Sequence, residues 1–373
     1  MHKEQREQTH QLLQKNQIGQ AIFAKPDSIK WLTGVAVPIQ MGPNFFASGN
    51  PLVWYDHGQF TLIIVASYAD LAAPFGKEAD CHLITYPGHT TNEPITAGQR
   101  LIDAFGRAAI VQRTGKLGLE REYVSDLIAQ GVRATAGEVV AIDGWLEPLR
   151  MVKTSEEQAI LRRNFGLGDV GHAAAQRAIE DGQREIDVWT EIHSAIQKTA
   201  GCRVPLGNDC VVNTRQDNIG GWPLDYALKP NGSLVVDLSV ILDGYWSDSC
   251  GTYYVNVRTP KQEKIHRTVQ QALEFGISLV RPGAVAKDID QKIRKFIADA
   301  GYPVYPHHTG HGVGVSGHEA PRIVPYNDDV LREGMVIMLE PGIYLPGEFG
   351  VRLEDGMLVT ANGAEVLTHH TKD

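Results

Sequence analysis

Cysteine is scarce in this chain. Only four of the 373 residues are cysteine, at Cys81, Cys202, Cys210 and Cys250, and no two of them have C-x-x-C spacing. A disulfide framework, or a zinc site built from thiolates, normally needs closely spaced cysteines that this sequence does not have. The composition is therefore typical of a protein of the reducing cytoplasm, and we expect a cytoplasmic location.

Long apolar runs and an excess of positive charge are also missing. The longest mostly apolar stretch, Phe60 to Ala66, is far shorter than the ~20 residues of a membrane-spanning helix. The N-terminus is polar and charged, so we expect no signal peptide. With 35 Lys and Arg against 44 Asp and Glu, the net charge is -9. We therefore expect neither a nucleic-acid partner, which would require a basic face, nor a membrane partner.

The remaining composition predicts two domains with different patterns. The chain is 43% hydrophobic, which is enough for a core, and its length is typical of two domains. Residues 1–150 alternate short β-like runs, such as 108–112, with helical segments, and His57-Gly58 is typical of a hairpin turn. This alternation predicts an α/β domain with a mixed sheet. In residues 151–373, long helices precede Gly-rich strands, and Thr154 with Glu157 predicts a capping box at the first helix.

A hairpin in the second half brings two carboxylates toward one point. Asp243-Gly244 is a strong type I′ turn signal between two β-rich runs. A two-residue loop there places Asp248 opposite Ser239 and makes Asp237 its diagonal neighbour, with Cα atoms roughly 7–8 Å apart. Two such carboxylates repel each other unless positive charge lies between them, and two divalent cations about 3.5–4 Å apart fit that gap. The alternative is that both acids are solvated on an outward face.

Further candidate ligands lie in Gly-rich or apolar segments downstream. His311 and His318 lie in TGHGVGVSGHEAP, Glu340 lies in MLEPGIY, and Arg352 and Glu354 share one face of the strand GVRLEDG. A single histidine or glutamate of this kind more often has a structural role. An unpaired charge in a Gly-rich or apolar strand is nevertheless unfavourable. Four carboxylates and a neutral imidazole balance two divalent cations, and this donor set suits manganese, cobalt, iron or zinc better than calcium. Such a centre can supply hydroxide at neutral pH.

These motifs together resemble the pita-bread metallopeptidases (peptidase M24), which include Xaa-Pro aminopeptidases, prolidases and methionine aminopeptidases, and the related creatinases. The similar segments are GYWSD, GHGVG, HEAP, EPGIY and GVRLED, with SIKWLTG near Lys30 and the junction LEPLRMVKTSEEQAILRR. The resemblance implies a creatinase/prolidase-like α/β domain over residues 1–150 and an α+β pita-bread catalytic domain over 151–373. Methionine aminopeptidases lack the extra N-terminal domain, so the prolidase branch is favoured.

The resemblance also implies roles for individual residues. It implies metal ligands at Asp237, Asp248, His311, Glu340 and Glu354, with Asp248 and Glu354 bridging two divalent ions. Glu340 would also carry the proton beside the nucleophilic water. His318 would contact the substrate and stabilise the tetrahedral intermediate, and His307 would be a further catalytic histidine. Arg352 would orient the acidic ligands on the substrate side of the site. For His307 and the adjacent His308, the alternative is that one simply packs in the wall.

One region departs from the peptidase pattern. Peptidase members carry another histidine about 17–18 residues before the first aspartate, where this chain has Ile219 and Gly220, and no histidine lies between His193 and Asp237. The residues that could replace it are Trp222, Asp217, Asp225 and Tyr226, and Trp222 is our candidate for binding substrate. The departure bears on Xaa-Pro specificity more than on metal binding.

The leading hypothesis is a dinuclear metal-dependent hydrolase that cleaves an Xaa-Pro dipeptide, or the N-terminal residue of a short peptide. A metal-bridging hydroxide would attack the amide, and Glu340 would pass the proton to the leaving amine. A second hypothesis keeps the metal site but changes the reaction, as in creatinase-like amidinohydrolases, ectoine-type hydrolases and a sulfonium lyase. A third is a non-catalytic binding module, as in histone-chaperone and ribosome-associated relatives that have lost ligands. By resemblance, we also expect a homodimer.

Overall fold

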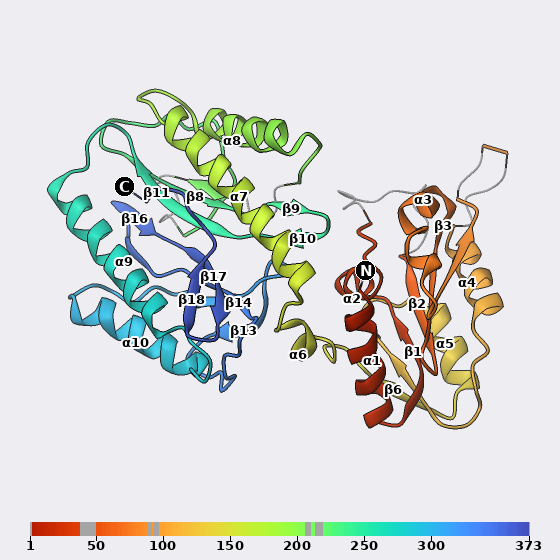
Figure 1. The fold of residues 1–373 in the computed structure, drawn as a ribbon. Helices are drawn as coiled ribbons and strands as arrows, with labels where there is room; N and C mark the ends of the chain where they lie inside the picture. The colour runs from red at the N-terminus through yellow and green to blue at the C-terminus, as the bar shows by residue number, and fades with distance from the viewer. Residues whose placement is uncertain are drawn as a thin grey trace. The chain divides into compact units, whose positions relative to one another are not determined.

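The computed structural model describes residues 2–37, 50–88, 91–92, 97–205, 210–212 and 219–372. The chain divides into two compact units, Met1–Leu149 and Arg150–Asp373, each with its own sheets and helices (Figure 1). Among the described helices, none combines the length and the apolar character that crossing a membrane requires. The cysteines with described side chains, Cys81, Cys202 and Cys250, are free thiols.

The described part of the N-terminal unit is built on a mixed six-stranded sheet in the order β4-β3-β2-β1-β5-β6. Its strands are β1 (Ile18–Phe23), β2 (Leu52–Asp56), β3 (Gln59–Val65), β4 (Cys81–Tyr86), β5 (Lys116–Leu119) and β6 (Glu138–Ala141). The first three pair antiparallel, and the others join in parallel. The mixed sheet confirms the predicted α/β class.

Helices cover this sheet and connect its strands. Their bounds are α1 (Lys3–Lys15), α2 (Pro26–Thr33), α3 (Ala69–Ala72), α4 (Ala97–Ala108) and α5 (Asp126–Thr135), with short 3-10 turns at Ala66–Tyr68 and Phe75–Lys77. A further short helix, α6 (Glu147–Arg150), follows the last strand of this sheet and ends at the first residue of the next unit. α4 and α5 bury an apolar face against the sheet, and α1 lies on its opposite side (Figure 1). This unit therefore has a core of its own.

Two local predictions for this unit have different outcomes. The hairpin at His57-Gly58 is confirmed, because Asp56 pairs with Gln59 and both turn residues have positive φ. The β-like run at 108–112 is not a strand, since β5 begins only at Lys116. The side chain of Gln20 instead donates to the carbonyl of residue 110 and accepts from the amide of residue 112. These contacts satisfy backbone groups that would otherwise need a neighbouring strand.

The C-terminal unit pairs helices with curved sheets in two halves. In the first, α7 (Ser155–Ala178) and α8 (Glu185–Ala200) pack on a sheet of order β11-β8-β7. In the second, α9 (Pro260–Leu279) and α10 (Ala286–Asp299) pack on a sheet of order β13-β12-β14-β17-β18 (Figure 1). The backbone contact between Cys250 and Glu354 joins the halves. Of the candidate site residues, Asp237, His311 and Arg352 lie on strands, and Asp248, Glu340 and Glu354 lie directly next to strand ends.

The bounds of these strands are β7 (Cys210–Val212), β8 (Ser233–Leu238), β9 (Ile241–Leu242), β10 (Tyr245–Trp246), β11 (Ser249–Tyr254), β12 (Gly310–Gly312), β13 (Glu319–Ile323), β14 (Val336–Leu339), β15 (Gly342–Leu345), β16 (Phe349–Arg352), β17 (Asp355–Thr360) and β18 (Gly363–Val366).

The predicted capping box at the start of α7 is confirmed. Thr154 Oγ1 accepts from the amide of Glu157 at 3.3 Å, and Glu157 Oε2 accepts from the amide of Thr154 at 2.9 Å.

Candidate active site

The predicted hairpin forms with the predicted register. Asp243 and Gly244 both have positive φ, 51° and 72°, as a type I′ turn requires. Ser239 Oγ donates to Asp248 Oδ1 at 3.1 Å, which confirms that these two residues lie opposite each other. Asp237 on β8 pairs with Cys250 on β11, and both aspartates are buried. The solvated, outward-facing alternative for the pair is therefore wrong.

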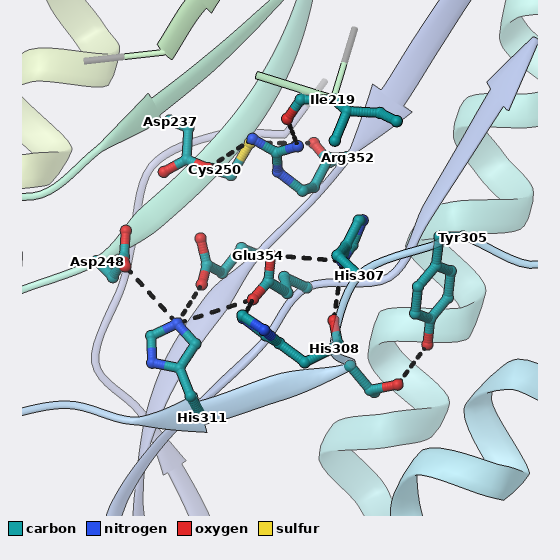
Figure 2. Close-up of polar contacts among 12 residues, drawn as sticks. Ile219, Asp237, Asp248, Cys250, Tyr305, His307, His308, His311, Arg352 and Glu354 are labelled. Carbon is teal, nitrogen blue, oxygen red and sulfur yellow. Dashed lines mark hydrogen bonds and ion pairs between the residues drawn. The ribbon is translucent and has the colours of Figure 1, made fainter. Parts of the chain in front are cut away.

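His311 lies on β12 with one ring nitrogen directed at buried carboxylates. Its Nδ1 is 2.8 Å from the carbonyl oxygen of Gly312, and a carbonyl can only accept. In the neutral imidazole Nδ1 therefore holds the proton and Nε2 presents a lone pair. That Nε2 is 3.7 Å from Asp248 Oδ2 and 3.9 Å from Glu354 Oε1 (Figure 2). It is also 3.7 Å from Glu340 Oε1. Burial lowers the pKa of His311 to about 3, which keeps the ring neutral.

The buried carboxylates are poorly compensated by the protein alone. Burial, followed by repulsion from neighbouring carboxylates, raises the pKa of Asp248 and of Glu354 well above the usual range. Burial also raises the pKa of Asp237, against the opposing charge of Arg352. Among the described residues, Asp237 Oδ1 has no hydrogen-bond partner. Oxygen donors of this kind, with one imidazole nitrogen, fit divalent metal ions.

Arg352 is the cation beside this cluster. Its Nη2 donates to Asp237 Oδ2 at 2.6 Å (Figure 2). Its Nη1 donates to the Tyr344 hydroxyl at 3.1 Å. Nη1 also donates to the backbone carbonyl of Ile219 at 2.5 Å. Ile219 stands where the resemblance predicts a histidine, so at this position the described contact to the site comes from backbone. The resulting geometry fits a residue that orients Asp237.

Two adjacent histidines face Glu340. His308 Nε2 is 2.7 Å from Glu340 Oε1, whereas His307 Nδ1 is 3.7 Å from Glu340 Oε2. Both ring nitrogens of His307 have other partners, the carbonyl of His308 and the hydroxyl of Tyr344, each at 2.8 Å. Burial by itself would raise the pKa of Glu340, but the His308 contact and the nearby imidazoles lower it to about 2. Glu340 is therefore ionised at neutral pH.

His318 lies next to His311, with ring centroids 4.2 Å apart. Burial lowers the pKa of His318. The following residue, Glu319, anchors this loop through Lys153 Nζ at 2.8 Å, Arg150 Nε at 3.4 Å and the amide of Ser316 at 3.2 Å. This buried ion cluster joins the start of the unit to the loop that carries His318.

The residues that could replace the histidine absent near Gly220 have different surroundings. Trp222 is 72% exposed, Asp225 forms an ion pair with Arg184 at 3.2 Å, and the Tyr226 ring has Lys229 Nζ 5.9 Å from its centroid. Asp217 lies outside the described residues. Of the three described candidates, Trp222 presents a large apolar surface to solvent.

Sequence reasoning missed two residues near Glu340. The sequence predicts a catalytic role for His307 and no role for Arg322. In the structure His308 makes the shorter contact with Glu340, and Arg322 Nη2 is 3.2 Å from His308 Nδ1. The cluster of four histidines at 307–318 was the available signal. The sequence alone does not indicate which of two adjacent histidines contacts Glu340, because the direction of each ring depends on partners that are distant in the sequence.

Comparison with known families accounts for both units. Residues 159–361 match metallopeptidase family M24, and residues 5–152 match the creatinase/prolidase N-terminal domain. The chain belongs to metallopeptidase family M24. It is thus a metal-dependent peptidase, as predicted, and the two matches confirm the creatinase/prolidase-like and pita-bread architecture.

Individual known proteins resemble the chain over most of its length. It is 31% identical to an Xaa-Pro dipeptidase from Pyrococcus horikoshii over 281 residues, which cover 74% of this chain and 79% of the relative. It is 29% identical to the Xaa-Pro dipeptidase of Pyrococcus furiosus over 98% of both chains. Among solved structures, the prolidase of Pyrococcus horikoshii superposes with a TM-score of 0.82 at 25% identity and covers 99% of each chain.

Proposed function

We propose that this M24 metallopeptidase is an Xaa-Pro dipeptidase that uses two divalent metal ions. The candidate ligands are Asp237, Asp248, His311, Glu340 and Glu354. The observation that carries the proposal is the direction of His311, whose unprotonated Nε2 faces three buried carboxylates at 3.7 to 3.9 Å. The orphaned oxygen of Asp237 supports the same conclusion, because a bound cation would satisfy it. Manganese, cobalt, iron and zinc all suit this donor set.

When bound, such ions activate water and polarise the scissile carbonyl. Glu340 is ionised at neutral pH, so its carboxylate would accept the proton of the attacking water and deliver it to the leaving nitrogen. His318, neutral beside His311, would donate a hydrogen bond to the substrate where negative charge develops. Arg352 would hold Asp237 in place, and His307 would act through Tyr344 as a positioning residue.

The rim of the site supports a dipeptide as substrate. Arg322 on β13 is exposed, and its guanidinium contacts His308, which in turn contacts Glu340. A guanidinium is suited to bind a carboxylate through two hydrogen bonds, and a dipeptide presents its C-terminal carboxylate close to the scissile bond. Trp222 and Ile219 are exposed apolar side chains that would contact the apolar parts of the substrate.

A substrate panel tests the proposal. Metal-free protein would be supplied separately with manganese, cobalt, iron or zinc and assayed on Ala-Pro, Leu-Pro, Met-Ala, Ala-Pro-amide, creatine and ectoine-like amides. We expect metal-dependent hydrolysis of the Xaa-Pro dipeptides and slower hydrolysis of Ala-Pro-amide, which lacks the carboxylate. Hydrolysis of the amidino or cyclic compounds, with none of the dipeptides, would instead support the non-peptidase alternative.

Two further features belong to the proposal. We expect a homodimer, by resemblance to the family, and a cytoplasmic location, from the sparse cysteines. Sedimentation equilibrium of the full chain tests the first, and cell fractionation tests the second.

A further inference from the structure

The imidazole of His308 lies between Arg322 and Glu340. Its Nδ1 is 3.2 Å from Arg322 Nη2, and its Nε2 is 2.7 Å from Glu340 Oε1. A guanidinium has only donors, so Nδ1 must accept, and the proton of the neutral ring is then on Nε2. That N–H donates to the carboxylate of Glu340. The two contacts therefore select the same tautomer.

This tautomer argues against a competing function for the same ring. The ligand atoms of His308, His311 and His318 lie within 4.8 Å of one another, as in a possible metal site. A metal ligand needs an unprotonated nitrogen, but Arg322 occupies the Nδ1 lone pair and the Nε2 carries the proton. The contacts thus favour His308 as a hydrogen-bond donor to Glu340 over His308 as a ligand.

The Glu340 oxygen that accepts from His308 also faces the candidate metal ligand His311. Glu340 Oε1 is 2.7 Å from His308 Nε2 and 3.7 Å from His311 Nε2. A carboxylate oxygen has two lone pairs, so it can accept one N–H while it also faces a cation. Hydrogen bonds of this kind orient the carboxylates of metal sites, and their loss typically reduces affinity or activity about 10–100-fold.

We propose that His308 is a positioning residue that couples Arg322 at the rim to Glu340 in the site. The inference rests on the proposed dipeptidase function. A substrate carboxylate bound to Arg322 fixes the position of its guanidinium. The fixed guanidinium holds His308 as the Nε2–H tautomer, and this N–H orients the carboxylate of Glu340. Arginine has five donors, so Arg322 can bind the carboxylate and His308 together. Recognition of dipeptide length is thereby linked to the orientation of the proton-carrying carboxylate.

A set of variants of the full chain tests this coupling. His308→Phe keeps a ring but removes the N–H, and His308→Gln restores both a donor and an acceptor. Arg322→Gln removes the rim cation, and the Arg322→Gln/His308→Phe double variant completes a cycle. His82→Phe, at an exposed histidine on β4, is the matched control. The measurements are manganese affinity by calorimetry, kcat and KM on Ala-Pro, and the histidine tautomer by ¹⁵N spectroscopy.

We expect His308→Phe to lower both manganese affinity and kcat about 10-fold or more, and His308→Gln to recover most of the loss. Arg322→Gln should raise KM, lower kcat and shift the His308 tautomer away from Nε2–H. In the double variant, the loss in kcat should be smaller than the product of the two single losses. The control should match the parent protein in every measurement.

Two results would overturn the inference. One is unchanged manganese affinity and kcat in His308→Phe, and the other is strictly multiplicative losses of kcat in the cycle. Failure of the proposed function is distinguishable, because the parent protein would then leave Ala-Pro intact with every metal. In that event the calorimetry and the tautomer measurement still decide whether Arg322, His308 and Glu340 are coupled.

Discussion

Arg352 Nη2 and Asp237 Oδ2 meet at 2.6 Å, and both side chains are buried. Asp237 shares its surroundings with other buried carboxylates whose pKa is raised by burial and mutual repulsion. A single guanidinium cannot balance them, which is why the site fits divalent cations. Within the part of the chain that the structure describes, Arg352 is the cation that contacts Asp237.

Arg352→Met should therefore destabilise the metal-free protein strongly. Removing one partner of a buried ion pair leaves an uncompensated charge, at about 3–5 kcal/mol in the free energy of unfolding. We expect a smaller loss with manganese bound, because the metal supplies positive charge. Urea unfolding with and without manganese measures both. The control is Arg162→Met at the exposed pair with Glu365, where we expect at most about 1 kcal/mol. Equal effects in the two variants would contradict the prediction.

Without bound metal, the stability of the folded protein should decrease as the pH rises above neutrality. Asp248 and Glu354 have raised pKa values in the folded protein, so the folded state binds more protons than the unfolded state, and stability falls as pH rises. Buried His311, with its pKa lowered to about 3, acts in the opposite sense, but only below its unfolded pKa of 6.5. Glu340, with its pKa lowered to about 2, loses its stabilising contribution only in acid.

We therefore expect the melting temperature of the metal-free protein to fall as the pH rises above about 6.5, where His311 no longer opposes the raised pKa values of Asp248 and Glu354. Manganese should raise the melting temperature more at the higher pH, because fewer protons compete for the ligands. Differential scanning calorimetry measures both, and Asp248→Asn, which removes one titrating group, should flatten the metal-free dependence. Metal-free stability that increases across this range would be inconsistent with the raised pKa values.

Glu340→Gln should separate proton transfer from metal binding. The amide can still accept from His308 and can still offer an oxygen to a cation, but it cannot carry the proton of the attacking water. We expect kcat to fall about 10²–10⁴-fold with metal still bound. Kinetics on Ala-Pro and calorimetry with manganese measure the two effects. The control is Glu348→Gln, at an exposed ion pair with Lys261. Full activity of Glu340→Gln with metal bound would exclude this role.

What the sequence could predict follows from the range of the interactions. The Asp243-Gly244 turn and the Thr154–Glu157 capping box are determined by residues close together in the chain, so both were predicted with the correct geometry. The hairpin register then brought Asp237 and Asp248 together without any knowledge of the tertiary fold. Local spacing therefore sufficed for this part of the candidate site.

Other contacts join residues that are distant in sequence. Arg352 reaches the carbonyl of Ile219 from 133 positions away, and Lys153 reaches Glu319 from 166 positions away. The direction of the His308 ring similarly depends on Glu340 and on Arg322. No periodicity or spacing encodes such pairs, so they appear only once the sheets are assembled.

The glycines that flank His311 leave no room for a side chain. A Cβ on Gly312 would overlap the carbonyl oxygen of Ala320 on the neighbouring strand. Gly312→Ala should therefore displace β12, destabilise the protein by about 1–3 kcal/mol and weaken manganese binding by moving His311. Gly166→Ala on α7 is the matched control, since its Cβ meets nothing within 4 Å, and it should stabilise by up to about 1 kcal/mol. Urea unfolding and manganese calorimetry of both variants test this. Normal metal affinity in Gly312→Ala would mean that His311 does not depend on the close approach of β12 and β13.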